Sequence, residues 1–132
     1  MKKYQSKYNN RKITRDGQTF DSVKEYRRFC ELSLLERAGK VTDLKRQVKF
    51  VLIPAQYESV ERYSKKTGKR LKDKRVLLEK ECAYIADFVY ENESGRVVVE
   101  DVKGYKKGAA YDLFAVKRKM MLHKFGIRIQ EV

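Results

Sequence analysis

Two apolar segments dominate the sequence: Ala83-Tyr84-Ile85-Ala86-Asp87-Phe88-Val89-Tyr90 and Arg96-Val97-Val98-Val99-Glu100-Asp101-Val102-Lys103-Gly104. The turn-forming residues 91–95 separate them, which predicts an antiparallel hairpin. Side chains alternate along a strand, so Asp101 and Lys103 are expected on one face, with Asp87 on the neighbouring strand. Two carboxylates beside an amine can hold a divalent metal and an activated water. This hairpin is therefore the candidate site.

Helical and strand patterns on both sides of the hairpin predict an α/β domain. Ser22-Val23-Lys24-Glu25 has the form of a capping box, which starts a helix that ends near Gly39. This helix carries apolar residues around much of its circumference, which predicts burial on more than one side. They are Val23, Tyr26, Phe29, Cys30, Leu32, Leu34 and Leu35.

The remaining elements follow from periodicity and from turn residues. Residues 41–53 alternate as a strand that ends at Pro54, and residues 75–90 form a long strand region. A second helix is expected over residues 110–124, with Leu113, Val116 and Met120 on one face and Phe114 and Met121 beside it. Residues 127–132 alternate as a final strand.

Charge predicts the class of partner. The chain has 132 residues, with 32 Lys and Arg against 18 Asp and Glu, a formal net charge of +14. This balance favours a polyanion, most simply DNA, although a basic protein that is merely soluble is the alternative. We divide the chain into a basic arm over residues 1–19 and one domain over residues 20–132, with a charged loop or hairpin at about residues 56–75. The arm either follows a phosphate backbone or acts as a solubilising tail.

Cysteine use and hydropathy predict the compartment. Cys30 and Cys82 lack the spacing of metal ligands or of a disulfide framework, and are expected to be reduced. No signal peptide and no apolar stretch of membrane-spanning length is visible. We therefore expect a cytoplasmic protein with no membrane partner.

The element order and the Asp…Asp-x-Lys hairpin resemble the core of the PD-(D/E)XK nuclease superfamily. Within it, the chain is similar to small phage-encoded members, to Holliday junction resolvases and to transposon-end nucleases. The resemblance covers residues 20–132. It implies a restriction-endonuclease-like αβββαβ core, with a mixed central sheet flanked by helices. The location would then be the host cytoplasm if the chain is phage-encoded.

The resemblance also implies a function, a metal-dependent DNA endonuclease that hydrolyses phosphodiester bonds, with branched DNA as one candidate substrate. Its catalytic residues would be Glu25, Asp87, Asp101 and Lys103, and Asp87 and Asp101 would hold Mg²⁺ or Mn²⁺. The resolvase-like interpretation favours a homodimer. Two departures from the family pattern are that Ala86 stands where proline is common and that Asp101 stands where glutamate is commoner. The residues expected to contact DNA are Lys106, Lys107, Lys117, Arg118, Lys119, Lys2, Lys3, Arg11 and Lys12.

Several alternatives stay open at this point. Asp87 and Lys103 could form a partly buried ion pair, and a non-catalytic nucleic-acid-binding protein on a degenerate nuclease fold is the alternative function. The capping box by itself would explain Glu25, and Glu31 on the same helix is then the fallback catalytic acid. Asp43-Leu44-Lys45 has the same acidic-x-Lys form as the candidate site. Gln47 could orient substrate or a metal-bound water, and Glu100 is expected to face away from the site.

Overall fold

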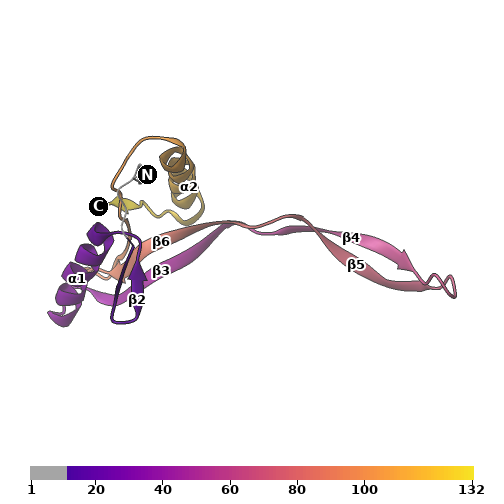
Figure 1. Cartoon of the computed structure of the whole chain (residues 1–132), viewed down its shortest axis with the longest axis horizontal. Helices are drawn as coiled ribbons and strands as arrows, with labels where there is room; N and C mark the ends of the chain where they lie inside the picture. Colours follow the sequence, from indigo (N-terminus) through magenta and orange to yellow (C-terminus); the bar gives the residue numbers. More distant parts are fainter. Residues whose placement is uncertain (1–11) are drawn as a thin grey trace, which may run out of the picture.

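A four-stranded sheet lies at the centre of the computed structural model, which describes residues 12–132 (Figure 1). Its strands, in spatial order, are β3 (Thr42–Ile53), β6 (Cys82–Glu91), β7 (Val97–Asp101) and β8 (Gln130–Glu131). The first three strands are antiparallel, and the short β8 runs parallel to β7. The predicted α/β class with a mixed sheet is therefore confirmed. Lys2, Lys3 and Arg11 of the predicted arm lie outside the described residues.

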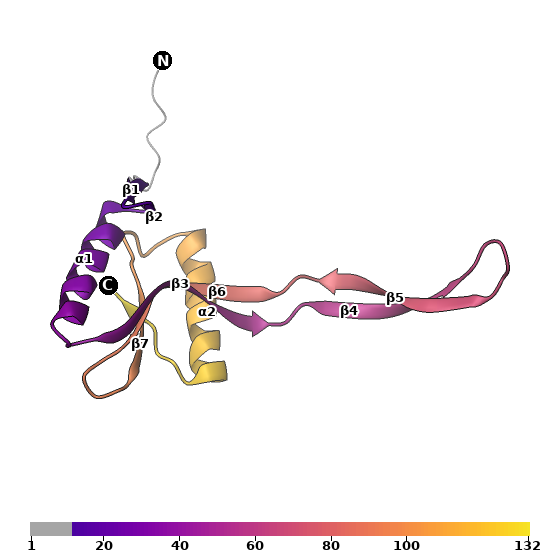
Figure 2. The same ribbon diagram turned by 90° about the horizontal axis from the view of Figure 1, so that it is seen from below.

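Two helices, α1 (Val23–Arg37) and α2 (Ala109–Phe125), flank this sheet (Figure 2). Tyr84 and Ala86 in the first half of β6 belong to an apolar cluster with residues of α2. Phe88 and Tyr90 in its second half belong to a cluster with residues of α1. Along β6, Asp87 lies between Ala86 of the first cluster and Phe88 of the second. Within residues 12–132, neither helix combines the length and the apolar character that a membrane crossing requires.

Each helix buries a narrower stripe than the sequence predicts. In α1, Leu32 is buried but Leu34 is 63% exposed, so the prediction of burial on several sides is wrong. In α2, Phe114 and Met121 are buried, whereas Leu113 and Val116 are exposed. Phe114 and Met121 are seven residues apart and therefore lie on one stripe of the helix. The apolar residues of α2 cover two stripes, and packing against the sheet selects one of them.

A small hairpin precedes α1 and packs against it. It consists of β1 (Ile13–Arg15) and β2 (Gln18–Phe20), so the predicted arm boundary at residue 19 falls within it. The buried Phe20 ring lies 5.1 Å from the ring centroid of Tyr26. The Arg46 guanidinium lies 3.8 Å from the Phe20 ring centroid and also donates to the Thr19 carbonyl. These contacts attach the last residues of the predicted arm to the domain.

A second hairpin, here called the long arm, projects far beyond the sheet (Figures 1 and 2). It consists of β4 (Gln56–Tyr63) and β5 (Arg70–Glu79), which within residues 12–132 pair only with each other. The sequence predicts a charged loop or hairpin here, and the structure has a hairpin that continues to Glu79. The predicted strand region over residues 75–90 is confirmed in large part, because only residues 80 and 81 lie outside β5 and β6.

Candidate functional site

A cavity of about 310 Å³ opens beside the start of α1 and the end of β7. Glu25 comes from the first turn of α1, Asp87 from β6 and Asp101 from the last position of β7. Lys103 follows two residues later, and all four of these side chains line the cavity. The structure thus brings together every residue predicted to be catalytic, from three separate elements.

Asp101 is buried and has a partner on each side of its carboxylate. It is 6% exposed, and its two carboxylate oxygens have different partners. The Lys103 ammonium lies 2.7 Å from Oδ1, and the Tyr84 hydroxyl donates to Oδ2 at 2.6 Å. The Lys103 ammonium also lies 3.6 Å from the ring centroid of Phe114. Lys103 therefore pairs with Asp101, and not with Asp87 as the ion-pair alternative supposed.

Asp87 is held by neutral donors instead. The main-chain N–H of Val102 donates to Oδ2 at 2.8 Å, and the Gln47 amide donates to Oδ1 at 3.2 Å. Burial, together with the negative charges of Asp101 and Glu25, raises the pKa of Asp87 to about 7, although these two hydrogen bonds act to lower it. A carboxylate of this kind is poised to bind either a proton or a cation at neutral pH.

Glu25 serves both the start of α1 and the cavity. Its main-chain N–H donates to the Ser22 hydroxyl at 3.1 Å, as a capping box requires. Its carboxylate, however, accepts from the N–H of Asp21 rather than that of Ser22, and from the Gln47 amide at 3.0 Å. The side chain is buried, so a cap alone does not account for its surroundings.

Gln47 connects Glu25 to Asp87. Its amide nitrogen donates to both carboxylates, while its own backbone adopts a φ of +51°. A positive φ is uncommon for a residue other than glycine and is a local cost that the surrounding structure must support. This conformation within β3 accompanies an amide that holds two acids in place, and the orientation of substrate or of a metal-bound water by Gln47 stays a prediction.

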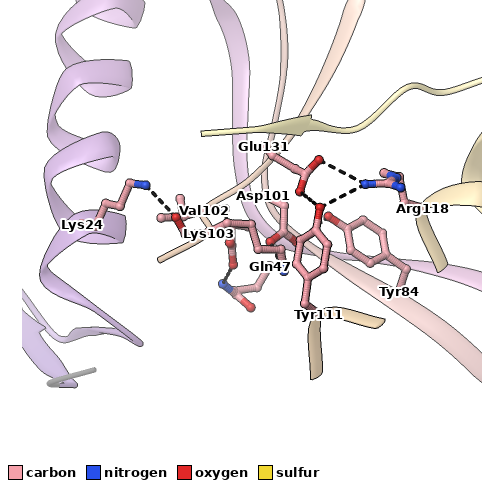
Figure 3. A network of polar contacts seen from close by, with 10 residues as sticks. Lys24, Gln47, Tyr84, Asp101, Val102, Lys103, Tyr111, Arg118 and Glu131 are labelled. Atoms are coloured by element: carbon pink, nitrogen blue, oxygen red, sulfur yellow. Dashed lines mark hydrogen bonds and ion pairs between the residues drawn. The ribbon is translucent and has the colours of Figure 1, made fainter. Parts of the chain in front are cut away.

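Two segments, α1 and the residues after β8, hold the backbone around Lys103, and Figure 3 shows the contact from α1. The Lys24 ammonium donates to the Lys103 carbonyl at 2.6 Å. The Lys103 N–H donates to the Val132 carbonyl, and the Val132 N–H donates to the Asp101 carbonyl, each at 2.9 Å. The last residues of the chain therefore align the Asp101–Lys103 segment through parallel pairing beyond β8.

Burial distinguishes the candidate triplet Asp101-Val102-Lys103 from Asp43-Leu44-Lys45, which has the same acidic-x-Lys form. Lys45 lies 3.3 Å from Asp43, and the two side chains are 59% and 61% exposed. In the candidate site, the Lys103 and Asp101 side chains are 20% and 8% exposed. The same acidic-x-Lys pattern thus forms a surface ion pair in one place and a partly desolvated one in the other. Glu31 pairs with Arg28 at 2.9 Å and does not line the cavity.

The residues predicted to contact DNA divide into two groups. Lys12, Lys106, Lys107 and Lys119 are exposed, so their charges are accessible. Arg118 is half-buried and lies 3.3 Å from Glu131, and it also donates to the Tyr111 hydroxyl (Figure 3). These contacts give Arg118 a structural role, because they hold α2 against β8. Lys117, on the same helix, is also half-buried.

Sequence reasoning missed two important side-chain pairs, Tyr84 with Asp101 and Arg28 with Glu100. Tyr84 supplies a buried donor to Asp101, and burial together with Asp101 raises the pKa of its hydroxyl. Glu100 is fully buried and accepts several hydrogen bonds from the Arg28 guanidinium, the shortest at 2.6 Å. Both pairs join residues far apart along the chain. The only sequence signal for the second pair was a glutamate within an apolar strand.

The two central acids suit a divalent cation. The pKa of Asp87 is raised by burial and by the negative charges of Asp101 and Glu25, and a bound cation would stabilise the charged form of this carboxylate. No group of three or more His, Cys, Asp or Glu within residues 12–132 is arranged to hold a metal ion. Two carboxylates with water and substrate oxygens are a ligand set that Mg²⁺ accepts. Asp87 and Asp101 would hold the ion.

The raised pKa of Asp87 leads to a pH-dependent prediction. Between about pH 4 and pH 7 the folded chain retains a proton on Asp87 that the unfolded chain releases, so this group favours the unfolded state as the pH rises. Asp87→Asn in EDTA should raise the thermal midpoint at pH 8 by about 5 °C or more, and by less near pH 5. Calorimetry over this pH range checks it. A change that is equal at every pH would contradict the raised pKa.

Comparison with known proteins provides a family and no activity. The family model DUF1064, described as a protein of unknown function, matches residues 5–130. The chain therefore belongs to the DUF1064 family. No curated protein and no solved structure matches the chain.

Proposed function

We propose that this DUF1064 protein is a metal-dependent DNA endonuclease that hydrolyses phosphodiester bonds in the cavity described above. The observation that carries the proposal is the convergence of Glu25, Asp87, Asp101 and Lys103 in one cavity. The order α1, β3, β6, β7, α2 and β8 around a mixed sheet is consistent with a PD-(D/E)XK core. The net charge of +14 suits a polyanionic substrate.

The side chains have distinct roles in this proposal. Held by Asp87 and Asp101, Mg²⁺ or Mn²⁺ would polarise the phosphodiester and lower the pKa of a coordinated water. The Lys103 ammonium would leave Asp101 and donate to the attacking water or to the phosphate, where it offsets developing negative charge. Gln47 would act as a positioning residue, because its amide holds both Asp87 and Glu25.

Exposed lysines near the cavity would position the substrate. Gly104 lines the cavity and leads into the loop that carries Lys106 and Lys107. Contacts of this kind with phosphates fix the register of a duplex without reading its sequence. The proposal therefore includes no base preference. DNA with a structural feature, such as a branch, is the substrate suggested by the resolvase-like resemblance.

The test uses four substrates and three metal conditions. The protein is incubated with four-way junction, flap, duplex and single-stranded DNA, each with Mg²⁺, Mn²⁺ or EDTA. We expect cleavage with metal, none with EDTA, and none from Asp87→Asn under any condition. Paired cuts at symmetric positions in the junction would support the homodimer. A folded protein that cuts none of the four with either metal would contradict the nuclease proposal.

A non-catalytic nucleic-acid-binding protein is the second candidate, and one observation favours it. Both oxygens of Asp101 are engaged within the protein, by Tyr84 and by Lys103. Such a closed pair could be purely structural. A binding protein would hold DNA in EDTA as tightly as in Mg²⁺, and Asp87→Asn would not alter that affinity. The nuclease is expected to respond to the metal in both binding and cleavage.

A further inference from the structure

The outer half of the long arm concentrates positive charge. Residues 62–75 contain eight lysines and arginines and one acidic residue, Asp73, a net charge of +7. The described side chains there are exposed with the exception of Ser64, which is half-buried at the start of the turn. A net charge equal to half of that of the whole chain is therefore held on this outer segment of the hairpin, which projects away from the domain (Figure 1).

Only some of these charges have partners within the arm. Arg70 lies 3.3 Å from Asp73 and 3.6 Å from Glu61. The Arg75 guanidinium lies 3.7 Å from the Tyr57 ring centroid, and Arg62 donates to the Lys72 carbonyl. Among residues 12–132, no carboxylate pairs with the other five cations of this segment. These five are Lys65, Lys66, Lys69, Lys72 and Lys74.

We propose that the long arm binds the phosphate backbone of duplex DNA beyond the segment held at the cavity. This inference rests on the proposed function and adds a second, remote contact to it. Five uncompensated lysines complement a polyanion, and the major groove of B-DNA admits a two-stranded β-ribbon. The apolar side chains of the arm, such as Leu71 and Leu77, are scattered among charges, which suits a charged partner better than an apolar one.

The length of the arm defines the substrate that it can reach. The eight residues of β4 span about 26 Å at a rise of roughly 3.3 Å per residue. The turn after Tyr63 extends this reach further. One turn of B-DNA is about 34 Å. The lysines at the tip would therefore contact phosphates about one helical turn from the domain, and a short duplex would not reach them.

The test compares two triple variants of equal net charge. The arm variant is Lys65→Gln, Lys66→Gln and Lys69→Gln. The control is Lys40→Gln, Lys45→Gln and Lys49→Gln, three lysines of the domain that each lie beside a carboxylate. Binding to duplexes of 10 and 30 base pairs is measured in EDTA by fluorescence anisotropy over a range of salt concentrations, so cleavage does not enter the result.

On the long duplex, the arm variant should bind at least tenfold more weakly than the parent at about 0.1 M salt. Its slope of log affinity against log salt should be less steep by about 3, because each lost phosphate contact removes roughly one unit. The control should change the slope by less than 1. On the short duplex, the parent and the arm variant should bind alike.

Three results would overturn the arm contact. The first is equal weakening in both triple variants, which would indicate an effect of net charge alone. The second is the same defect on short and long duplexes. The third is self-association of the chain that only the arm variant abolishes, with DNA affinity unchanged, since this would assign the arm to a protein contact. If one of these results is found but the unsubstituted protein still binds and cuts DNA, only the arm contact is overturned and the proposed function stands. A parent that binds no DNA in EDTA contradicts the arm contact, and one that also neither binds nor cuts DNA with Mg²⁺ contradicts both proposals.

Discussion

Lys103→Ala is expected to lower DNA cleavage by a factor of roughly 100 or more, the scale of a lost general acid–base or charge-offsetting group. DNA affinity should change little, because the interaction lost acts mainly in the transition state. Single-turnover cleavage with Mg²⁺ measures the rate, and anisotropy in EDTA measures DNA binding. A fall in turnover without a fall in affinity is the expected signature.

Lys45→Ala is the matched control, because Lys45 belongs to an acidic-x-Lys triplet of the same form on the surface. It should cut DNA at close to the parent rate. The thermal midpoint of each variant separates chemistry from folding, since Lys103→Ala leaves Asp101 with Tyr84 as its remaining side-chain partner. A well-folded Lys103→Ala that cuts at the parent rate would remove Lys103 from the catalytic site. If Lys103→Ala loses stability but its folded fraction keeps the parent turnover, the Lys103–Asp101 pair has a structural role.

Arg28→Ala is expected to destabilise the fold by about 3–5 kcal/mol, which is the cost of leaving a buried charge without its partner. Glu100 is fully buried, and Arg28 donates to both of its carboxylate oxygens. The thermal midpoint should fall by roughly 10 °C or more for a chain of this size. Urea unfolding followed by circular dichroism measures the free energy.

A paired substitution tests whether the effect arises from the unpaired charge. Arg28→Met combined with Glu100→Leu removes both charges and should recover much of the stability that Arg28→Ala loses. Lys40→Ala is the surface control, because Lys40 and Glu93 are both more than 60% exposed and their pair should contribute about 1 kcal/mol at most. Equal effects of Arg28→Ala and Lys40→Ala would contradict the burial argument.

Local pattern was enough to locate several features of the fold. The apolar alternation of residues 83–103 specified the β6–β7 hairpin, and the Ser22 cap specified the start of α1. These features depend on residues close together in sequence, where strand alternation and capping geometry act. The four candidate catalytic residues were chosen from such patterns and from a family resemblance. Their meeting in one cavity agrees with that choice, while their chemical roles stay predictions.

Tertiary structure decided the pairings and the exposed faces. The sequence contains two apolar stripes on α2, and nothing local distinguishes the buried one. Of the two acidic-x-Lys triplets, only the flanking apolar strand and Gly104 single out Asp101-Val102-Lys103, and they do not identify its partners. The partners of Asp101, Asp87 and Glu100 come from other elements, so they depend on how strands register and where α1 and α2 pack. The projection of the long arm depends likewise on the absence of any third strand beside β4 and β5 within the described chain. Burial then determined which charges interact strongly, because desolvation is a property of the packed structure and not of a residue's neighbours in sequence.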